Sequence, residues 1–325
     1  MDPLVFEPYL RPLLWGGRRL GVLFGKPLPN SGALYGESWE ISAHPHHVSR
    51  IAEGPWKGQL LTDLCAAQPR EIFGKQTAPT RFPLLIKLLD CDELISVQVH
   101  PTDEVAARLR PGEMGKTEAW VVLAAEPTGR IYAGLLPGLT RRELKEHLAN
   151  GTVAQCLNSF TPSAGDCIFL PAGTVHAVGG GVVLAEVQQT SDATFRLFDW
   201  NRLGQDGKPR TLHVEQALAA IDWDRGPVQT LNGAPIAGCP SGECLVQCPY
   251  FNMDRYFFDQ QLPNPYSGRL SIWIVFAGSA LLATSGNYRR SFRAGETVLI
   301  PASAPASSWK TANGPVTLLG VSLPS

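Results

Sequence analysis

The chain has little excess charge of either sign and no long hydrophobic run. Its 325 residues include 28 Lys and Arg against 29 Asp and Glu, which gives a formal net charge of −1. This balance argues against a generally basic nucleic-acid binder and against an acidic disordered tail. The longest apolar stretches, such as 119–125 and 272–277, are far shorter than the roughly 18 residues of a membrane helix. We therefore expect neither a nucleic acid nor a membrane as partner.

Cysteine and histidine are also scarce. The seven cysteines are odd in number and scattered, and the first residues, MDPLVFE, lack the basic start and apolar run of a signal peptide. These features predict a cytoplasmic protein with reduced thiols. No histidine follows His213. Metal chemistry that uses imidazole is therefore expected only before residue 214.

Glycine and proline, by contrast, are abundant, with 32 and 27 residues. They imply many turns and short elements, which argues against a bundle of long helices. Runs typical of strands lie at 84–89, 94–100, 118–124, 131–135, 167–171, 182–188, 195–199, 271–277 and 297–301. Helices are predicted at 62–68, from 102 to about 111, at 140–150 with a capping box, and at 214–221. The sequence thus predicts a mainly β protein with short helical insertions.

One β-type segment occurs twice. The string GDCIFLPA at 165–172 returns 130 residues later as GETVLIPA at 295–302. The matching glycine, acid, apolar and Pro-Ala positions indicate two tandem copies of one β unit. The first copy continues to His176, whereas the same offset gives Ala306 in the second. A metal site is therefore predicted in the first copy alone.

Polar side chains alternate along the predicted strand 94–100. Successive side chains of a strand point to opposite faces, so Ser96, Gln98 and His100 share one face. One interpretation is an edge strand whose polar face is in water. The nearly apolar run 84–89 just before it places this region inside the protein. A face that lines an internal cavity is therefore the favoured interpretation.

A second histidine follows a turn-and-strand motif. A Gly-Asp turn at 165–166 precedes the strand, and PAGTVH then ends at His176. This string resembles the second motif of cupin barrels, which place that histidine at a central metal. With the repeat, it implies tandem cupin-like β-barrels of the jelly-roll type. We expect a metal-binding domain at 1–225 with helical insertions and a metal-free cupin-like domain at 226–325.

Further strings, in the same order along the chain, resemble those of type I mannose-6-phosphate isomerases of the short bacterial form. They are Lys87, SVQVHP at 96–101, GKTEAW at 115–120, PAGTVHA at 171–177 and QTSDATFR at 189–196. The early strings WGG at 15–17 and GESW at 36–39 also fit. The resemblance covers roughly residues 7–220, and the last hundred residues match loosely, as a degenerate cupin.

The resemblance implies a chemistry and a cofactor. It implies interconversion of mannose 6-phosphate and fructose 6-phosphate by proton transfer through an enediol(ate). One zinc ion per chain would be held by Gln98, His100, Glu118 and His176. Two imidazoles and a carboxylate are usual zinc ligands. The neutral amide of Gln98 is a weaker ligand and could bind the substrate instead.

The resemblance also implies roles for charged residues. Arg196 matches the family's active-site arginine, and Lys116 matches an active-site lysine. Lys87 matches a substrate-contacting lysine, and Ser96 could supply a hydroxyl to the phosphate group of the substrate. These two residues would therefore hold that phosphate. The proton-transferring base stays open among Lys116, Asp192 and a zinc-bound water.

The residues alone leave alternatives to these roles. Arg196 could be neutralised by Asp192 or Asp199 instead of facing a cavity, and Lys116 could be a solvated loop charge. The string HPHH at 44–47 is interpreted as structural, and His213 as a helix cap or a core residue.

Two other functions compete with the isomerase, and the number of subunits is open. An iron-dependent cupin oxygenase would have no need of buried cations, and a non-catalytic sugar-binding cupin would keep the pocket without turnover. The sequence does not fix the oligomeric state, and a monomer is plausible.

Overall fold

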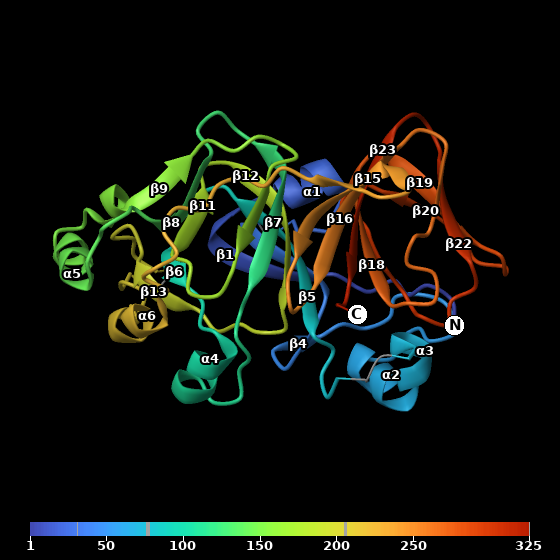
Figure 1. The fold of residues 1–325 in the computed structure, drawn as a ribbon, viewed down its shortest axis with the longest axis horizontal. Coiled ribbons are helices and arrows are strands. Elements are labelled where there is room, and N and C mark those ends of the chain that lie inside the picture. The colour runs from blue at the N-terminus through green and yellow to red at the C-terminus, as the bar shows by residue number, and fades with distance from the viewer. Residues whose placement is uncertain (31, 76–78, 205–206, 325) are drawn as a thin grey trace.

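A computed structural model describes residues 1–30, 32–75, 79–204 and 207–324 as a mainly β structure, which confirms the predicted class (Figure 1). The N-terminal strands form a six-stranded and a five-stranded sheet, and the strands from residue 234 onward form a six-stranded and a four-stranded sheet. Every strand pair of these sheets is antiparallel within the described residues. Antiparallel order agrees with the short turns that the abundant glycine predicts.

The N-terminal sheets position the residues of interest. In spatial order the six-stranded sheet contains β1 (Tyr9–Gly17), β2 (Tyr35–Ile41), β5 (Leu84–Cys91), β12 (Val182–Gln189), β7 (Glu118–Ala125) and β10 (Cys167–Leu170). The five-stranded sheet contains β13 (Phe195–Phe198), β6 (Val97–Val99), β11 (His176–Gly179), β8 (Arg130–Leu135) and β9 (Leu157–Phe160). A two-stranded ribbon joins β3 (Ala43–His44) to β4 (His47–Val48).

The C-terminal sheets repeat this arrangement. The six-stranded one contains β14 (Ala234–Ile236), β15 (Cys239–Gln247), β16 (Asn252–Phe258), β23 (Val316–Ser322), β18 (Ser271–Ala277) and β21 (Thr297–Ile300). The four-stranded one contains β17 (Gln261–Pro263), β22 (Ser307–Thr311), β19 (Ser279–Thr284) and β20 (Arg289–Arg293).

The helices are short and lie outside the sheets (Figure 1). They are α1 (Arg19–Phe24), α2 (Leu61–Ala67), α3 (Pro69–Phe73), α4 (Asp103–Leu109), α5 (Arg141–Ala149), the 3-10 helix η1 (Val153–Cys156) and α6 (Val214–Ala220). The predicted cap of Thr102 on α4 and the capping box of Thr140 and Glu143 on α5 are both formed. The strand predicted at 94–100 is shorter, because only β6 pairs with neighbours there.

The repeated segment forms corresponding strands in the two halves. β10 is the last strand of one six-stranded sheet, next to β7, and β21 is the last strand of the other, next to β18. The glycine that opens each copy has a positive φ, 95° at Gly165 and 82° at Gly295. Residues with a Cβ rarely adopt this conformation, so both copies require glycine at the turn.

The two halves share one hydrophobic core. Leu84, Ile86 and Val187 of the N-terminal half belong to the same buried cluster as Ile272 and Leu319 of the C-terminal half. Two segments near the N-terminus also contact the C-terminal half. Leu4 forms a β-bridge with Leu299, and the main chain of α3 accepts hydrogen bonds from residues 302 and 303.

The interior of the C-terminal half is filled by aromatic side chains. Trp273, Trp309, Tyr256 and Phe292 are each at most 1% exposed and belong to one cluster. Neighbouring rings lie 5.4–5.7 Å apart. Packing of this density leaves no room for a buried ion among these residues.

We expect a substitution in the shared core to lower the stability of both halves at once. Leu319→Ala, at a fully buried position, should reduce the free energy of unfolding by about 2–5 kcal/mol. Calorimetry should show a single transition at lower temperature. Leu23→Ala, at a position 45% exposed, is the control and should change stability by less than about 0.5–1 kcal/mol. Two separate transitions in the Leu319 variant would show that the halves unfold independently.

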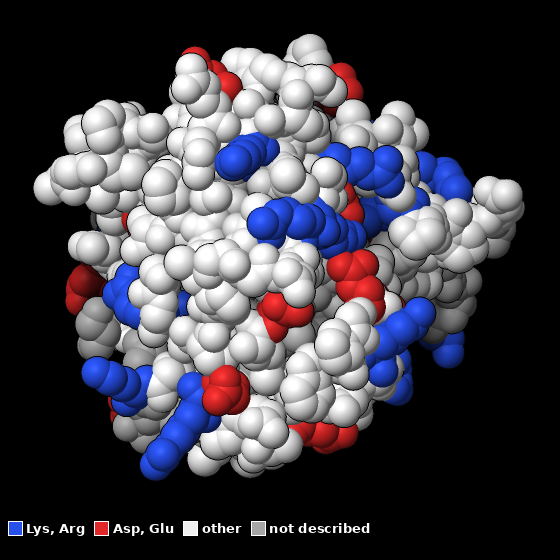
Figure 2. All heavy atoms as spheres, turned by 90° about the vertical axis from the view of Figure 1, so that its right-hand side faces the viewer, with Lys and Arg blue, Asp and Glu red and all other residues white. Residues whose placement is uncertain are grey.

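The surface matches the balanced composition. On the face of the C-terminal half shown in Figure 2, Lys and Arg lie among Asp and Glu, and neither sign of charge covers the face. Within the described ranges, no helix is both long and apolar enough to cross a membrane. The seven cysteines, all within the described ranges, are free thiols.

Candidate metal centre

Three side chains that are distant in sequence meet between the two N-terminal sheets. His100 follows β6, and His176 begins β11, which pairs with β6 in the five-stranded sheet. Glu118 begins β7 in the six-stranded sheet, where it lies opposite Gln188. All three side chains are at most 2% exposed. The pairing of strands, and not their spacing in sequence, therefore brings this group together.

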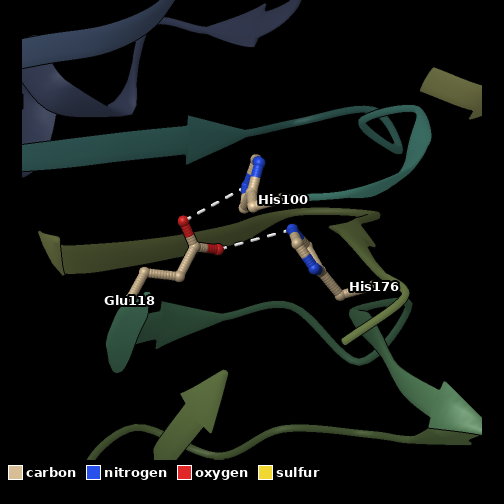
Figure 3. Close-up of side chains that lie close together, drawn as sticks. All are labelled: His100, Glu118 and His176. Atoms are coloured by element: carbon tan, nitrogen blue, oxygen red, sulfur yellow. Dashed lines mark ion pairs between the residues drawn. The ribbon is translucent and has the colours of Figure 1, made fainter. Parts of the chain in front are cut away.

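The carboxylate of Glu118 lies between the two imidazoles (Figure 3). Its Oε2 is 3.4 Å from Nε2 of His100, and its Oε1 is 3.4 Å from Nε2 of His176. One potential ligand atom from each residue lies within 4.8 Å of the other two. Gln98 reaches the same place, with Nε2 3.3 Å from Nε2 of His176. The arrangement can hold one metal ion.

Main-chain carbonyls orient both imidazoles. Nδ1 of His100 lies 2.9 Å from the oxygen of Ala193, and Nδ1 of His176 lies 2.9 Å from the oxygen of Thr174. A carbonyl only accepts, so each Nδ1 carries the proton and donates it, leaving the Nε2 lone pair toward Glu118. Burial lowers the pKa of His100 and lowers that of His176 to about 3. Both rings are thus neutral at pH 7, which is the form that binds a metal.

A lysine ammonium already lies against this donor set. Nζ of Lys116 is 2.7 Å from Oε2 of Glu118 and 2.9 Å from Nε2 of His100. Burial opposes ionisation of Glu118, but Lys116 and His100 hold the pKa of that carboxyl well below its usual range. Oε1 of Glu118 is buried and receives no hydrogen bond within the described residues. A buried carboxylate with one free oxygen, beside two neutral imidazoles whose Nε2 atoms carry lone pairs, fits a divalent metal.

A cavity of about 280 Å³ opens beside this donor set, and Gln98 and Lys116 belong to its wall. Its charged lining comprises Arg11, Glu37, Lys87, Arg110, Lys116, Glu186, Asp192, Arg196 and Arg210. Cations outnumber carboxylates by six to three, which favours an anionic ligand. A larger groove of about 1060 Å³ has mostly apolar walls. None of the three metal-ligand candidates lines either one, but Gln98 and Lys116, which contact them, line the smaller cavity. The smaller cavity is therefore the candidate site.

Comparison with known proteins gives this site a family. A family model described as phosphomannose isomerase type I, catalytic domain, matches residues 5–118. Mannose-6-phosphate isomerase of Streptococcus mutans is 33% identical over 300 residues, which is 92% of this chain and 92% of that protein. ManA of Bacillus subtilis, also named mannose-6-phosphate isomerase, is 33% identical over 301 residues, or 92% and 93% of the two chains.

The chain belongs to the type I mannose-6-phosphate isomerase family. A crystal structure of the Bacillus subtilis mannose 6-phosphate isomerase supports this at the level of the fold. It superposes with a TM-score of 0.89 at 32% identity, covering 99% of this chain and 100% of that one. The match includes the C-terminal half, where the sequence resemblance was loose.

The remaining residues that the family resemblance singles out all line the cavity. Lys87 is buried and pairs with Glu186 at 3.0 Å, and Ser96 donates a hydrogen bond to Oε1 of Gln98 at 3.3 Å. Asp192 lies 4.0 Å from Arg11. Although burial opposes ionisation, Lys87 and Arg11 keep the pKa of Asp192 below its usual value.

One alternative from the sequence is wrong. Lys116 is not a solvated loop charge, because it is 4% exposed and paired with Glu118. The alternative for Arg196 holds only in part. Arg196 forms no direct ion pair with Asp192 or Asp199 within the described part of the chain, and Nη1 donates to the main-chain oxygen of Thr211 at 2.8 Å, but the charge of Asp199 still acts on Arg196. Across the strand pair Arg196 lies opposite Gln98, and both residues line the cavity.

His213 occupies the N-cap position of α6, as one of its two interpretations predicts, but its side chain forms no capping hydrogen bond and is only half-buried, so it is not a core residue. Nδ1 instead accepts a hydrogen bond from the main-chain nitrogen of Arg196 at 3.3 Å, and the ring lines the cavity.

Sequence reasoning missed several residues of the site. Arg11 on β1, Arg110 at the end of α4 and Arg210 all line the cavity, and His46 lies 3.5 Å from Asp192. Nothing in the local pattern around these residues indicates a site. His44 of the HPHH string also has a carboxylate neighbour from a distant segment, because Glu113 lies 3.4 Å from it.

Proposed function

We propose that the protein interconverts mannose 6-phosphate and fructose 6-phosphate with one zinc ion per chain. The observation that carries the proposal is the buried group of His100, Glu118 and His176, whose neighbours Gln98 and Lys116 line a cavity with excess positive charge. The relatives named mannose-6-phosphate isomerase, at 33% identity over most of the chain, support the choice of substrate.

The donor set suits zinc. His100, His176 and Glu118 supply the two nitrogens and the carboxylate that zinc prefers, and Gln98 is the weaker fourth candidate. When bound, zinc would polarise the sugar oxygens and stabilise negative charge that develops on them. Iron with open positions for oxygen is the alternative, but the excess of cations in the cavity wall, six against three carboxylates, favours an anionic sugar over dioxygen.

The reaction moves one proton between carbons and one between oxygens. The proton on C2 of the aldose is transferred to C1, and the hydroxyl proton on O2 moves to O1, through an enediol(ate). Asp192 is ionised and lines the cavity, so it can accept a proton, whereas Lys116 can donate one next to the ligand cluster. Arg196, across the strand pair from Gln98, would stabilise the anionic oxygens. Lys87 and Ser96 would contact the substrate.

We also propose the division into two cupin-like domains, at 1–225 and 226–325. The corresponding edge strands β10 and β21 support it, and so do the paired sheets of each half. The aromatic interior of the C-terminal half supports a metal site in the first domain alone.

Metal analysis combined with an isomerase assay tests the function. We expect close to one zinc per chain, turnover of mannose 6-phosphate, loss of that turnover after chelation, and recovery when zinc is restored. Iron dependence with oxygen consumption would favour the oxygenase. Zinc binding without turnover would favour the non-catalytic binding protein.

A further inference from the structure

Apart from Lys116, which pairs with Glu118, the charges that line the cavity are divided into two groups. The first group, on β1, β2, β5 and β12, contains Arg11, Lys87, Glu37 and Glu186, with Asp192 close by. Arg11 pairs with Glu37 at 2.9 Å, and Lys87 pairs with Glu186 at 3.0 Å. Each cation of this group therefore has its own carboxylate, and the group has no spare positive charge.

The second group has too few carboxylates. Asp199 forms ion pairs with both Arg202, at 2.7 Å, and Arg210, whose Nε also donates to it at 2.6 Å. Arg196 lies near the same three residues without a carboxylate of its own. Burial and the neighbouring charge of Arg210 lower the pKa of Arg196, and its Nε is buried without a hydrogen-bond partner in the described chain. Three guanidiniums thus share one carboxylate.

One more residue adds to this excess. Arg110, at the C-terminal end of α4, lines the cavity and forms no ion pair within the described ranges. His213 accepts a hydrogen bond at Nδ1 from the main-chain nitrogen of Arg196, and burial together with the charges of Arg196 and Arg110 lowers its pKa, so its ring adds no positive charge. Like charges held together in this way destabilise the free protein, and an anion placed among them would remove that repulsion.

We propose that Arg110 and Arg210, together with His213, bind the dianionic phosphate of the substrate, and that Lys87 does not. Guanidinium groups suit this task, because their donors match two phosphate oxygens at once. Lys87 is paired one to one with Glu186, whereas Arg210 must share the single carboxylate of Asp199 with Arg202, so Lys87 with Ser96 contacts the sugar hydroxyls instead. Arg196 then lies between the phosphate and the ligand cluster. The nature of the substrate rests on the proposed function, whereas the anion subsite does not.

Two arginine variants test the subsite. Arg110→Ala and Arg210→Ala should each raise KM for mannose 6-phosphate about tenfold or more, with kcat changed by less than about threefold. The inhibition constant of inorganic phosphate should rise by the same factor. Arg110 is exposed and Arg202 still pairs with Asp199, so both variants should fold. Arg108→Ala removes an exposed arginine from the same helix, outside the cavity, and should change neither constant.

A measurement without turnover separates this inference from the proposed function. Inorganic phosphate should raise the melting temperature of the zinc-loaded protein, and less so in the Arg110 and Arg210 variants. Ser96→Ala should keep the full effect. Unchanged phosphate protection in both arginine variants, or its loss in Ser96→Ala, would overturn the subsite even if the protein isomerises mannose 6-phosphate. Absence of isomerase activity together with the expected phosphate effects would overturn only the proposed function.

Discussion

His176→Ala is expected to remove the bound metal and the isomerase activity together. The side chain supplies a bare Nε2 that faces Glu118, and its Nδ1 is held by the carbonyl of Thr174. Without the His176 imidazole, only His100 and Glu118 remain as strong ligands, and the carboxylate of Glu118 loses one of its two neighbouring imidazoles. Activity should fall by at least about 10³-fold, since a catalytic metal contributes several kcal/mol.

Zinc content and turnover, measured on the same preparation, check this expectation. His147→Ala is the control, because His147 lies on α5, bonds to Thr152 at 2.8 Å and has no contact with the ligand cluster. That variant should keep full zinc and full activity. A His176 variant that retains one zinc per chain would remove His176 from the ligands.

Arg196→Ala should separate metal binding from turnover. The guanidinium lines the cavity but contacts none of the three metal-ligand candidates, so zinc content should stay near one per chain. Loss of a group that stabilises anionic charge should reduce kcat by about 10²–10³-fold. Arg196→Lys keeps the charge but loses the planar donors, so it should recover part of the activity. Loss of zinc in the alanine variant would contradict the assigned role.

Parts of the candidate ligand cluster have local signals in the sequence, although the full set came from the family resemblance. Alternation along one strand places Ser96, Gln98 and His100 on the same face, and a turn-and-strand motif ends at His176. Glu118 is a weaker case, since only strand pairing brings it to the imidazoles. Its position at the start of an apolar strand is the one local signal that it points inward.

The cationic side of the cavity could not be predicted from local pattern. Arg110 looks like an ordinary residue at a helix end, and Arg210 lies in a connection with no periodicity. Their importance depends on the fold, which brings α4 and the segment before α6 to the same wall. His213 lies at the N-cap position, as its place before a helix suggests, but its contact with Arg196, 17 residues earlier, has no local signal in the sequence.

The core common to both halves limits how such proteins can be recombined. A chimera joined in the connection between β13 and β14 would keep each set of strands whole but replace one side of a packed surface. Side chains such as Ile86 and Ile272, which belong to the same buried cluster, would then pack against residues taken from a different protein. Functional hybrids between relatives should therefore require exchange of the contacting residues on β5, β12, β18 and β23 as one block, even though the metal-ligand candidates and the lining of the charged cavity all lie within the first 213 residues.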